Sequence, residues 1–189
     1  GKMTPEIHDQ AVSFEGDTKD CNYNMKLLNV TSDASHLEIF VSNGTDMHAD
    51  FIFSPKSLFY DIAENVGYIA PSSYCGNNDP KMVTDCMFDC WNIVVDWQSR
   101  AIHYLMEKKG VQAVFSHLHS IDMQEHRFIR FMSKGDKRYQ EDYEAGEPEM
   151  YQKFMDDVYM QADKYIGTFL HLLDEDWTVI ITSDHAQVC

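Results

Sequence analysis

Two short groups of acidic and imidazole side chains each follow an apolar run of the chain. In the first, "SIDMQEH", Asp122 and His126 are separated by three residues. One turn of helix would place both side chains on the same side, where they could share a metal ion. In the second, "TSDH", Asp184 and His185 are adjacent at the end of the run "WTVIIT". Carboxylate oxygens and neutral imidazole nitrogens are ligands suited to zinc, manganese or iron.

Asp184 and His185 can bind one metal ion only if the backbone around them has a suitable geometry. Because side chains alternate along a strand, Asp184 and His185 would point to opposite faces if a regular strand continued through them. Sharing one metal therefore requires the chain to bend at that point. An isolated Asp-His dipeptide is usually a polar pair in a loop. The hypothesis of a metal site depends on finding two such pairs, each after an apolar run.

The elements around these pairs alternate in type. Apolar runs predict strands at 113–116 and 178–182, and helical periodicity predicts long helices at 80–109 and 149–174. Alternating helices and strands are typical of an α/β fold with a mostly parallel sheet and flanking helices. Ligands collect beyond the carboxyl ends of such strands, so neighbouring strands would bring both pairs to one rim. The polar residues 133–148 are expected as a surface loop.

The residues before 79 give a different pattern. They predict a polar lead-in, a hairpin, a short strand and a short helix, at 1–20, 25–30 with 37–41, 51–55 and 57–65 respectively. We therefore expect two parts. Residues 1–78 would form a small mixed, β-rich lobe or insertion, and residues 79–189 would form the α/β core segment that carries the metal motifs.

The charge balance excludes one class of partner. The 189 residues contain 31 acids against 15 Lys and Arg, which gives a formal net charge of −16. A nucleic-acid groove is not expected, because phosphates would be repelled. A phosphate-handling site in such a chain needs local positive charge, which bound metal cations can supply. No run of 18 apolar residues is present, so no membrane span is expected.

The five cysteines are an odd number at irregular spacing, which is a poor disulfide framework. This usage leans towards a reducing, cytoplasmic compartment, although a signal peptide could have been cut from a longer precursor. Cys86 and Cys90 lie one helical turn apart. Free thiols packed on the apolar side of a helix are favoured there over a metal or disulfide role.

Both motifs resemble those of a known group of enzymes. "TSDHA" resembles the Thr-Ser-Asp-His-Gly motif of the alkaline phosphatase superfamily, with Ala186 at the position of the glycine. "SIDMQEH" resembles that superfamily's Asp-x-x-x-His motif. The type I phosphodiesterase and nucleotide pyrophosphatase branch matches best, and cofactor-independent phosphoglycerate mutases share both patterns. The resemblance covers roughly residues 111–189.

The resemblance implies a metal-dependent phosphoric ester hydrolase with two divalent metals, usually zinc in this branch and often manganese in the mutases. Asp122 and His126 would hold one metal, and Asp184 and His185 would help to hold the other. His119 would contact these ligands without binding the metal itself, and would orient them. One metal would polarise a phosphoryl oxygen of a small phosphate ester. The other would activate a Thr or Ser nucleophile that becomes transiently phosphorylated.

Three parts of the family pattern are not found in the sequence: an upstream strand-end Asp, a Thr or Ser nucleophile at a helix start, and a further downstream His. We therefore expect an internal piece of a larger enzyme, with the nucleophile outside this chain and little activity on its own. A phosphomutase, a sulfatase and a non-catalytic binding domain with relic motifs remain as alternatives. The substrate, the metal, the role of the lobe and the oligomeric state are not determined by the sequence.

Overall fold

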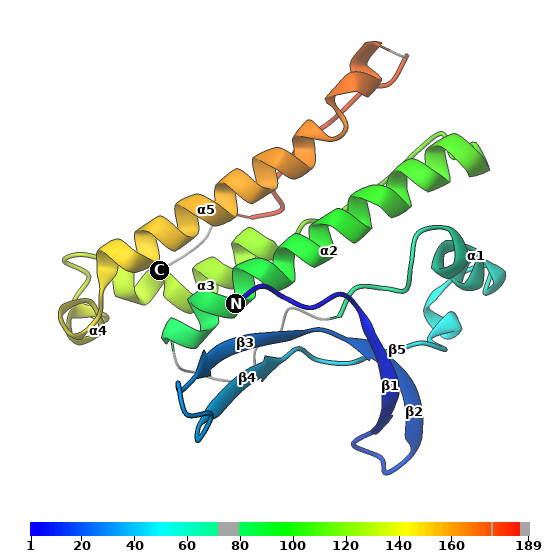
Figure 1. Cartoon of the computed structure of the whole chain (residues 1–189). Coiled ribbons are helices and arrows are strands. Elements are labelled where there is room, and N and C mark those ends of the chain that lie inside the picture. Colours follow the sequence, from blue (N-terminus) through cyan, green and yellow to red (C-terminus); the bar gives the residue numbers. More distant parts are fainter. Residues whose placement is uncertain (72–79, 175, 186–189) are drawn as a thin grey trace. The chain divides into compact units, whose positions relative to one another are not determined.

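The computed structural model of the chain describes residues 1–71, 80–174 and 176–185 (Figure 1). The chain divides into two compact units, Gly1–Val114 and Phe115–Cys189, and each is described by itself. The boundary expected after residue 78 falls in a stretch outside the described residues. The division into residues 1–78 and 79–189 therefore stays a prediction.

In the part of the first unit that the structure describes, the strands form two small antiparallel sheets. A three-stranded sheet has the order β1 (Ile7–Val12), β2 (Thr18–Tyr23), β5 (Thr45–Asp46), and a two-stranded sheet pairs β3 (Met25–Val30) with β4 (Leu37–Val41). The hairpin predicted from the sequence is confirmed as β3 and β4 with its predicted bounds. Its register runs from Met25↔Val41 to Val30↔Leu37, with one shift between Leu27 and Asn29.

Two predictions in this unit are wrong. Residues 1–20 are not a loose lead-in, because β1 pairs with β2 over a continuous register from Ile7↔Tyr23 to Val12↔Thr18. The side chains of β1 are mostly exposed, so backbone pairing and not an apolar alternation defines the hairpin. Residues 51–55 are not a strand, since a 3-10 helix, η1 (Asp50–Ile52), lies there.

The two helices predicted in the first unit are confirmed as α1 (Ser57–Asn65) and α2 (Pro80–Lys109). Polar contacts hold α2 to the rest of the unit: Lys26 Nζ lies 2.7 Å from Asp89 Oδ2, and the Tyr104 hydroxyl donates to Asp61 Oδ1 at 2.9 Å. The side chains of Cys86 and Cys90 are buried and form no disulfide, as expected. No described helix is long and apolar enough to cross a membrane.

The described residues of the second unit form three helices and a short 3-10 segment: α3 (Ser120–Met132), α4 (Gln140–Ala145), α5 (Pro148–Gly167) and η2 (Leu170–Asp174). The predicted second long helix is confirmed as α5 but ends at Gly167, and α4 lies within the predicted loop 133–148. Phe128 of α3 packs between two rings of α5, stacked on Tyr151 and edge-to-face against Phe154. Helix α5 buries a largely apolar side, and α3 adds the buried ring of Phe128 beside the buried Ser120 and Gln124, so the α3–α5 pair forms the core of this unit.

The fold is mixed α/β, but the mostly parallel sheet expected from the sequence is not supported. Both observed sheets are antiparallel, and in the described part of the chain residues 111–119 and 177–183 run without assigned secondary structure. Phe115 and Ile180 expose 101% and 82% of their surface. A strand exists only when its backbone groups pair with a neighbour, and apolar residues alone do not supply one.

Candidate functional site

The first motif lies at the start of α3, where helical geometry places its residues. His119 precedes the helix, Asp122 is in its first turn and His126 is one turn further along. A carboxylate in the first turn is favoured by the partial positive charge of a helix N-terminus. As the spacing predicted, Asp122 and His126 face each other, with His126 Nε2 3.2 Å from Asp122 Oδ1.

The second motif lies on the extended segment that follows α5 and η2. The chain bends at Asp184, which is the condition for Asp184 and His185 to serve one site. Two local hydrogen bonds shape the bend. The hydroxyl of Ser183 donates to the carbonyl oxygen of His185 at 2.6 Å, and the backbone N–H of His185 donates to Asp184 Oδ1 at 3.1 Å.

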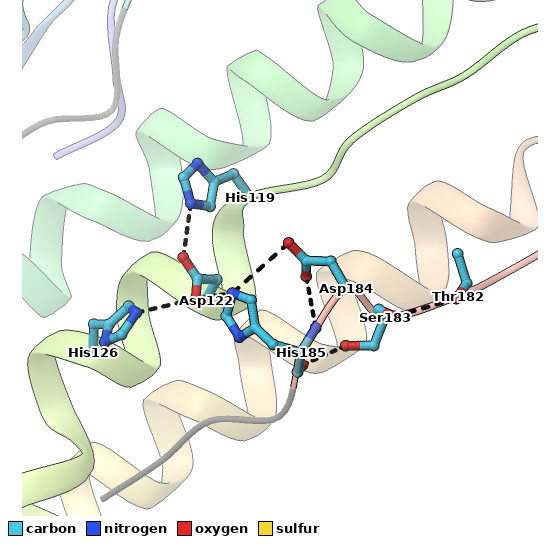
Figure 2. Close-up of polar contacts among 7 residues, drawn as sticks. All are labelled: His119, Asp122, His126, Thr182, Ser183, Asp184 and His185. Carbon is cyan, nitrogen blue, oxygen red and sulfur yellow. Dashed lines mark hydrogen bonds and ion pairs between the residues drawn. The ribbon is translucent and has the colours of Figure 1, made fainter.

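The two motifs converge on the carboxylate of Asp122, as Figure 2 shows. His119 Nε2 lies 2.7 Å from Asp122 Oδ2. On the other oxygen, His185 Nε2 lies 3.8 Å from Asp122 Oδ1, on the same atom that His126 approaches. Asp184 Oδ2 is 3.7 Å from His185 Nε2. The five residues singled out by the sequence therefore form one cluster, which we call the Asp122 cluster.

Burial within the Asp122 cluster is uneven. The side chain of Asp122 is 25% exposed, whereas those of His126, His185 and Asp184 are 62%, 52% and 75% exposed. Asp122 Oδ1 is a buried atom that accepts no hydrogen bond, and its contacts with His126 and His185 are ion pairs only when those rings are protonated. A buried carboxylate oxygen in this situation is costly unless positive charge comes close to it. Asp122 is thus the centre at which a cation would be stabilised most.

The donor types of the cluster fit a divalent metal. At a tetrahedral zinc with bonds of about 2.0–2.1 Å, neighbouring donor atoms lie about 3.3 Å apart. The distances of 3.2 and 3.8 Å from Asp122 Oδ1 to the two imidazole nitrogens are of this size. Within the described residues, however, no group of three or more His, Cys, Asp or Glu is arranged to hold a metal ion. The cluster therefore has donors of suitable types, but in this structure it is not a complete metal site.

Two further contacts lie near the cluster. The rings of His117 and His119 stack with centroids 4.9 Å apart. Glu125 accepts a hydrogen bond from the Tyr159 hydroxyl at 2.6 Å, and this bond together with burial raises the pKa of Tyr159 to about 12. The sequence could not indicate this contact, because it joins two helices through residues 34 positions apart.

The sequence of the chain also matches a known protein family. The family model described as type I phosphodiesterase / nucleotide pyrophosphatase matches residues 40–188. The chain belongs to the type I phosphodiesterase / nucleotide pyrophosphatase family. Members of this family are hydrolases that act on phosphoesters. No curated protein and no solved structure matches the chain.

The family match confirms the resemblance and extends it. The sequence motifs indicated the resemblance over residues 111–189, whereas the match begins at residue 40, within β4. Residues 40–78 of the expected N-terminal lobe therefore fall inside the match. Both motifs of the Asp122 cluster fall inside the match. Ala186, at the position of the family's glycine, lies outside the described residues.

Proposed function

We propose that the Asp122 cluster is part of the metal centre of a phosphodiesterase or nucleotide pyrophosphatase. The observation that carries the proposal is the convergence of two separate motifs on one buried carboxylate oxygen. The family match supports a phosphoester substrate. The net charge of −16 adds to the argument, because phosphate binding to so acidic a chain needs bound cations.

The roles of the residues follow their contacts. Asp122 and His126 would hold one divalent metal, zinc or manganese, and Asp184 and His185 would help to hold a second. When bound, the metals would polarise a phosphoryl oxygen and lower the pKa of a hydroxyl nucleophile. His119 holds Asp122 Oδ2, so the carboxylate keeps its other oxygen turned towards the remaining rings.

The nucleophile is a Thr or Ser that we place outside these 189 residues. It would take the phosphoryl group from the substrate and pass it to water. We further propose that segments 113–116 and 178–182 pair as neighbouring parallel strands in the active enzyme. Both are apolar, both are extended without assigned secondary structure, and each leads directly into the Asp122 cluster. Pairing would bury the exposed side chains of Phe115 and Ile180.

Zinc titration of the chain tests the metal-binding part of this proposal. We expect the unmodified chain to compete with a chromophoric chelator for Zn²⁺, and Asp122→Asn to abolish the competition. Asp136→Asn is the matched control, because Asp136 is a carboxylate of the same unit that pairs with Arg138. Equal zinc binding by all three proteins, or none by the unmodified chain, would contradict the proposal and favour a binding domain with relic motifs.

Hydrolysis of bis(p-nitrophenyl) phosphate tests the catalytic part. We expect no turnover by residues 1–189 alone, because the nucleophile lies elsewhere. A longer protein that contains this chain should be active, and Asp184→Asn should remove its activity while its circular dichroism stays unchanged. Turnover by residues 1–189 would place the nucleophile inside the chain, and an active Asp184→Asn enzyme would refute the metal assignment.

A further inference from the structure

Two tyrosine hydroxyls of α5 contact the first metal motif and the residues before it. The hydroxyls of Ser116 and Tyr165 are 2.5 Å apart, and the Tyr159 hydroxyl donates to Glu125 Oε1 at 2.6 Å. Ser116 precedes the start of α3, and Glu125 directly precedes His126. Residues 116–126, which carry most of the Asp122 cluster, are therefore held to one helix at two points.

These contacts complement the apolar packing of α3. Phe128 packs α3 on α5, whereas among the extended residues before Ser120 the side chain of Phe115 is exposed. The ring of Tyr165 is buried and packs edge-to-face on Phe169. Tyr165 is thus a fixed point to which the otherwise extended segment is attached.

Each tyrosine contact is connected to a proposed metal-binding residue through neighbouring residues. Ser116 is next to His117, whose ring stacks on His119, and His119 contacts Asp122 Oδ2. On the other side, Glu125 shares the backbone of α3 with His126. Since metal affinity depends on groups that orient the ligands, a shift at either end would alter the separation of Asp122 and His126.

We propose that Tyr159 and Tyr165 are positioning residues, which hold residues 116–126 so that Asp122 and His126 keep the separation needed to bind one divalent cation. This inference rests on the metal-binding role proposed above for these two residues. It adds that α5, which contributes no ligand of its own to the Asp122 cluster, sets the affinity of that cluster through two hydroxyl groups.

Cobalt binding to the chain tests the inference, because the visible absorption of bound Co²⁺ reports the coordination geometry as well as the affinity. Tyr159→Phe and Tyr165→Phe keep the rings and remove only the hydroxyls. We expect each to weaken Co²⁺ binding about 10-fold and to change the spectrum, with the double variant weaker still. Glu125→Gln keeps an acceptor for Tyr159 and should stay within about twofold of the unmodified chain, well short of the losses expected for the tyrosine variants.

Tyr104→Phe is the matched control, because it removes a tyrosine–carboxylate hydrogen bond to Asp61 in the first unit. Equal weakening by this control would overturn the inference, since general destabilisation would then explain the loss. If the unmodified chain binds Co²⁺ and the double variant shows the same affinity and spectrum, the positioning role of the tyrosines is overturned, while the proposed metal centre stands.

Absence of Co²⁺ binding by the unmodified chain would instead contradict the proposed metal centre, and the positioning role would fall with it. If Tyr165→Phe does not fold, as judged by circular dichroism, Ser116→Ala takes its place. This variant removes the same contact from the exposed side of the pair, where no buried ring is disturbed.

Discussion

Asp122 and His126 lie on a helix with a packed inner face, whereas Asp184 and His185 lie on an extended segment with exposed side chains. The helical half of the cluster obtains its geometry from α3 itself, from Phe128 and from α5. The extended half depends on two local hydrogen bonds around the bend. The helical half is therefore largely pre-organised, and the extended half is placed by weaker, local contacts.

The largest expected effect is on the packing of the helical half. Phe128 is 1% exposed, and Phe128→Ala should lower the free energy of unfolding by about 3–5 kcal/mol because it leaves a cavity between α3 and α5. Urea unfolding followed by circular dichroism measures this. Phe115→Ala, at a fully exposed ring of the extended region, should change stability by less than about 0.5 kcal/mol. Similar losses of stability for Phe128→Ala and Phe115→Ala would contradict the difference in packing between the helical and the extended half.

A smaller difference is expected between the two carboxylates as ligands. Asp122 approaches three imidazole rings and is largely buried, while Asp184 is 75% exposed and near one ring. Asp122→Asn should therefore weaken zinc binding by more than about 100-fold, beyond the loss usual for groups that only orient a ligand. Asp184→Asn should weaken it less. Competition with a chelator measures the zinc affinity of both variants. A larger loss for Asp184→Asn than for Asp122→Asn would show that the extended half contributes more to zinc binding.

One substitution can weaken the bend at Asp184 without changing the helical half. Ser183→Ala removes the hydrogen bond to the carbonyl oxygen of His185. One such bond contributes about 1 kcal/mol, so zinc affinity should fall about fivefold while global stability is unchanged. Thr182→Ser keeps its hydroxyl and serves as the control. No change in zinc affinity for Ser183→Ala would mean that contacts other than this bond hold His185.

The smallest effect concerns the contact between α3 and α5 at high pH. The hydrogen bond to Glu125 and burial raise the pKa of Tyr159 to about 12. The pKa of Tyr159 is higher in the folded chain than in the unfolded chain. The contribution of this contact to the free energy of unfolding is therefore complete below about pH 10 and is lost as the pH rises through about 12. Absorbance titration of the unmodified chain minus Tyr159→Phe should show one phenol ionising near this upper value. An ionisation at the ordinary value would contradict the contact.

The sequence by itself determined the local elements and the chemical types of the site. Helical periodicity predicted α1, α2 and most of α5, and apolar runs around a turn predicted β3 and β4, because these elements owe their form to neighbours along the chain. The spacing of Asp122 and His126 fixed their approach within one helical turn. The two motifs also identified the family before the comparison with family models confirmed it.

Only the tertiary structure decided what depends on distant residues. Strand β1 is almost entirely exposed and β2 buries only Cys21 and Asn22, so no alternation of apolar residues predicted this hairpin. Apolar segments 113–116 and 178–182 read as strands, yet a strand also requires a partner, which a pattern of side chains does not contain. The convergence on Asp122 and the tyrosine contacts of α5 join residues far apart along the chain. Their distances follow from packing, which is a property of the whole fold and not of any local stretch of sequence.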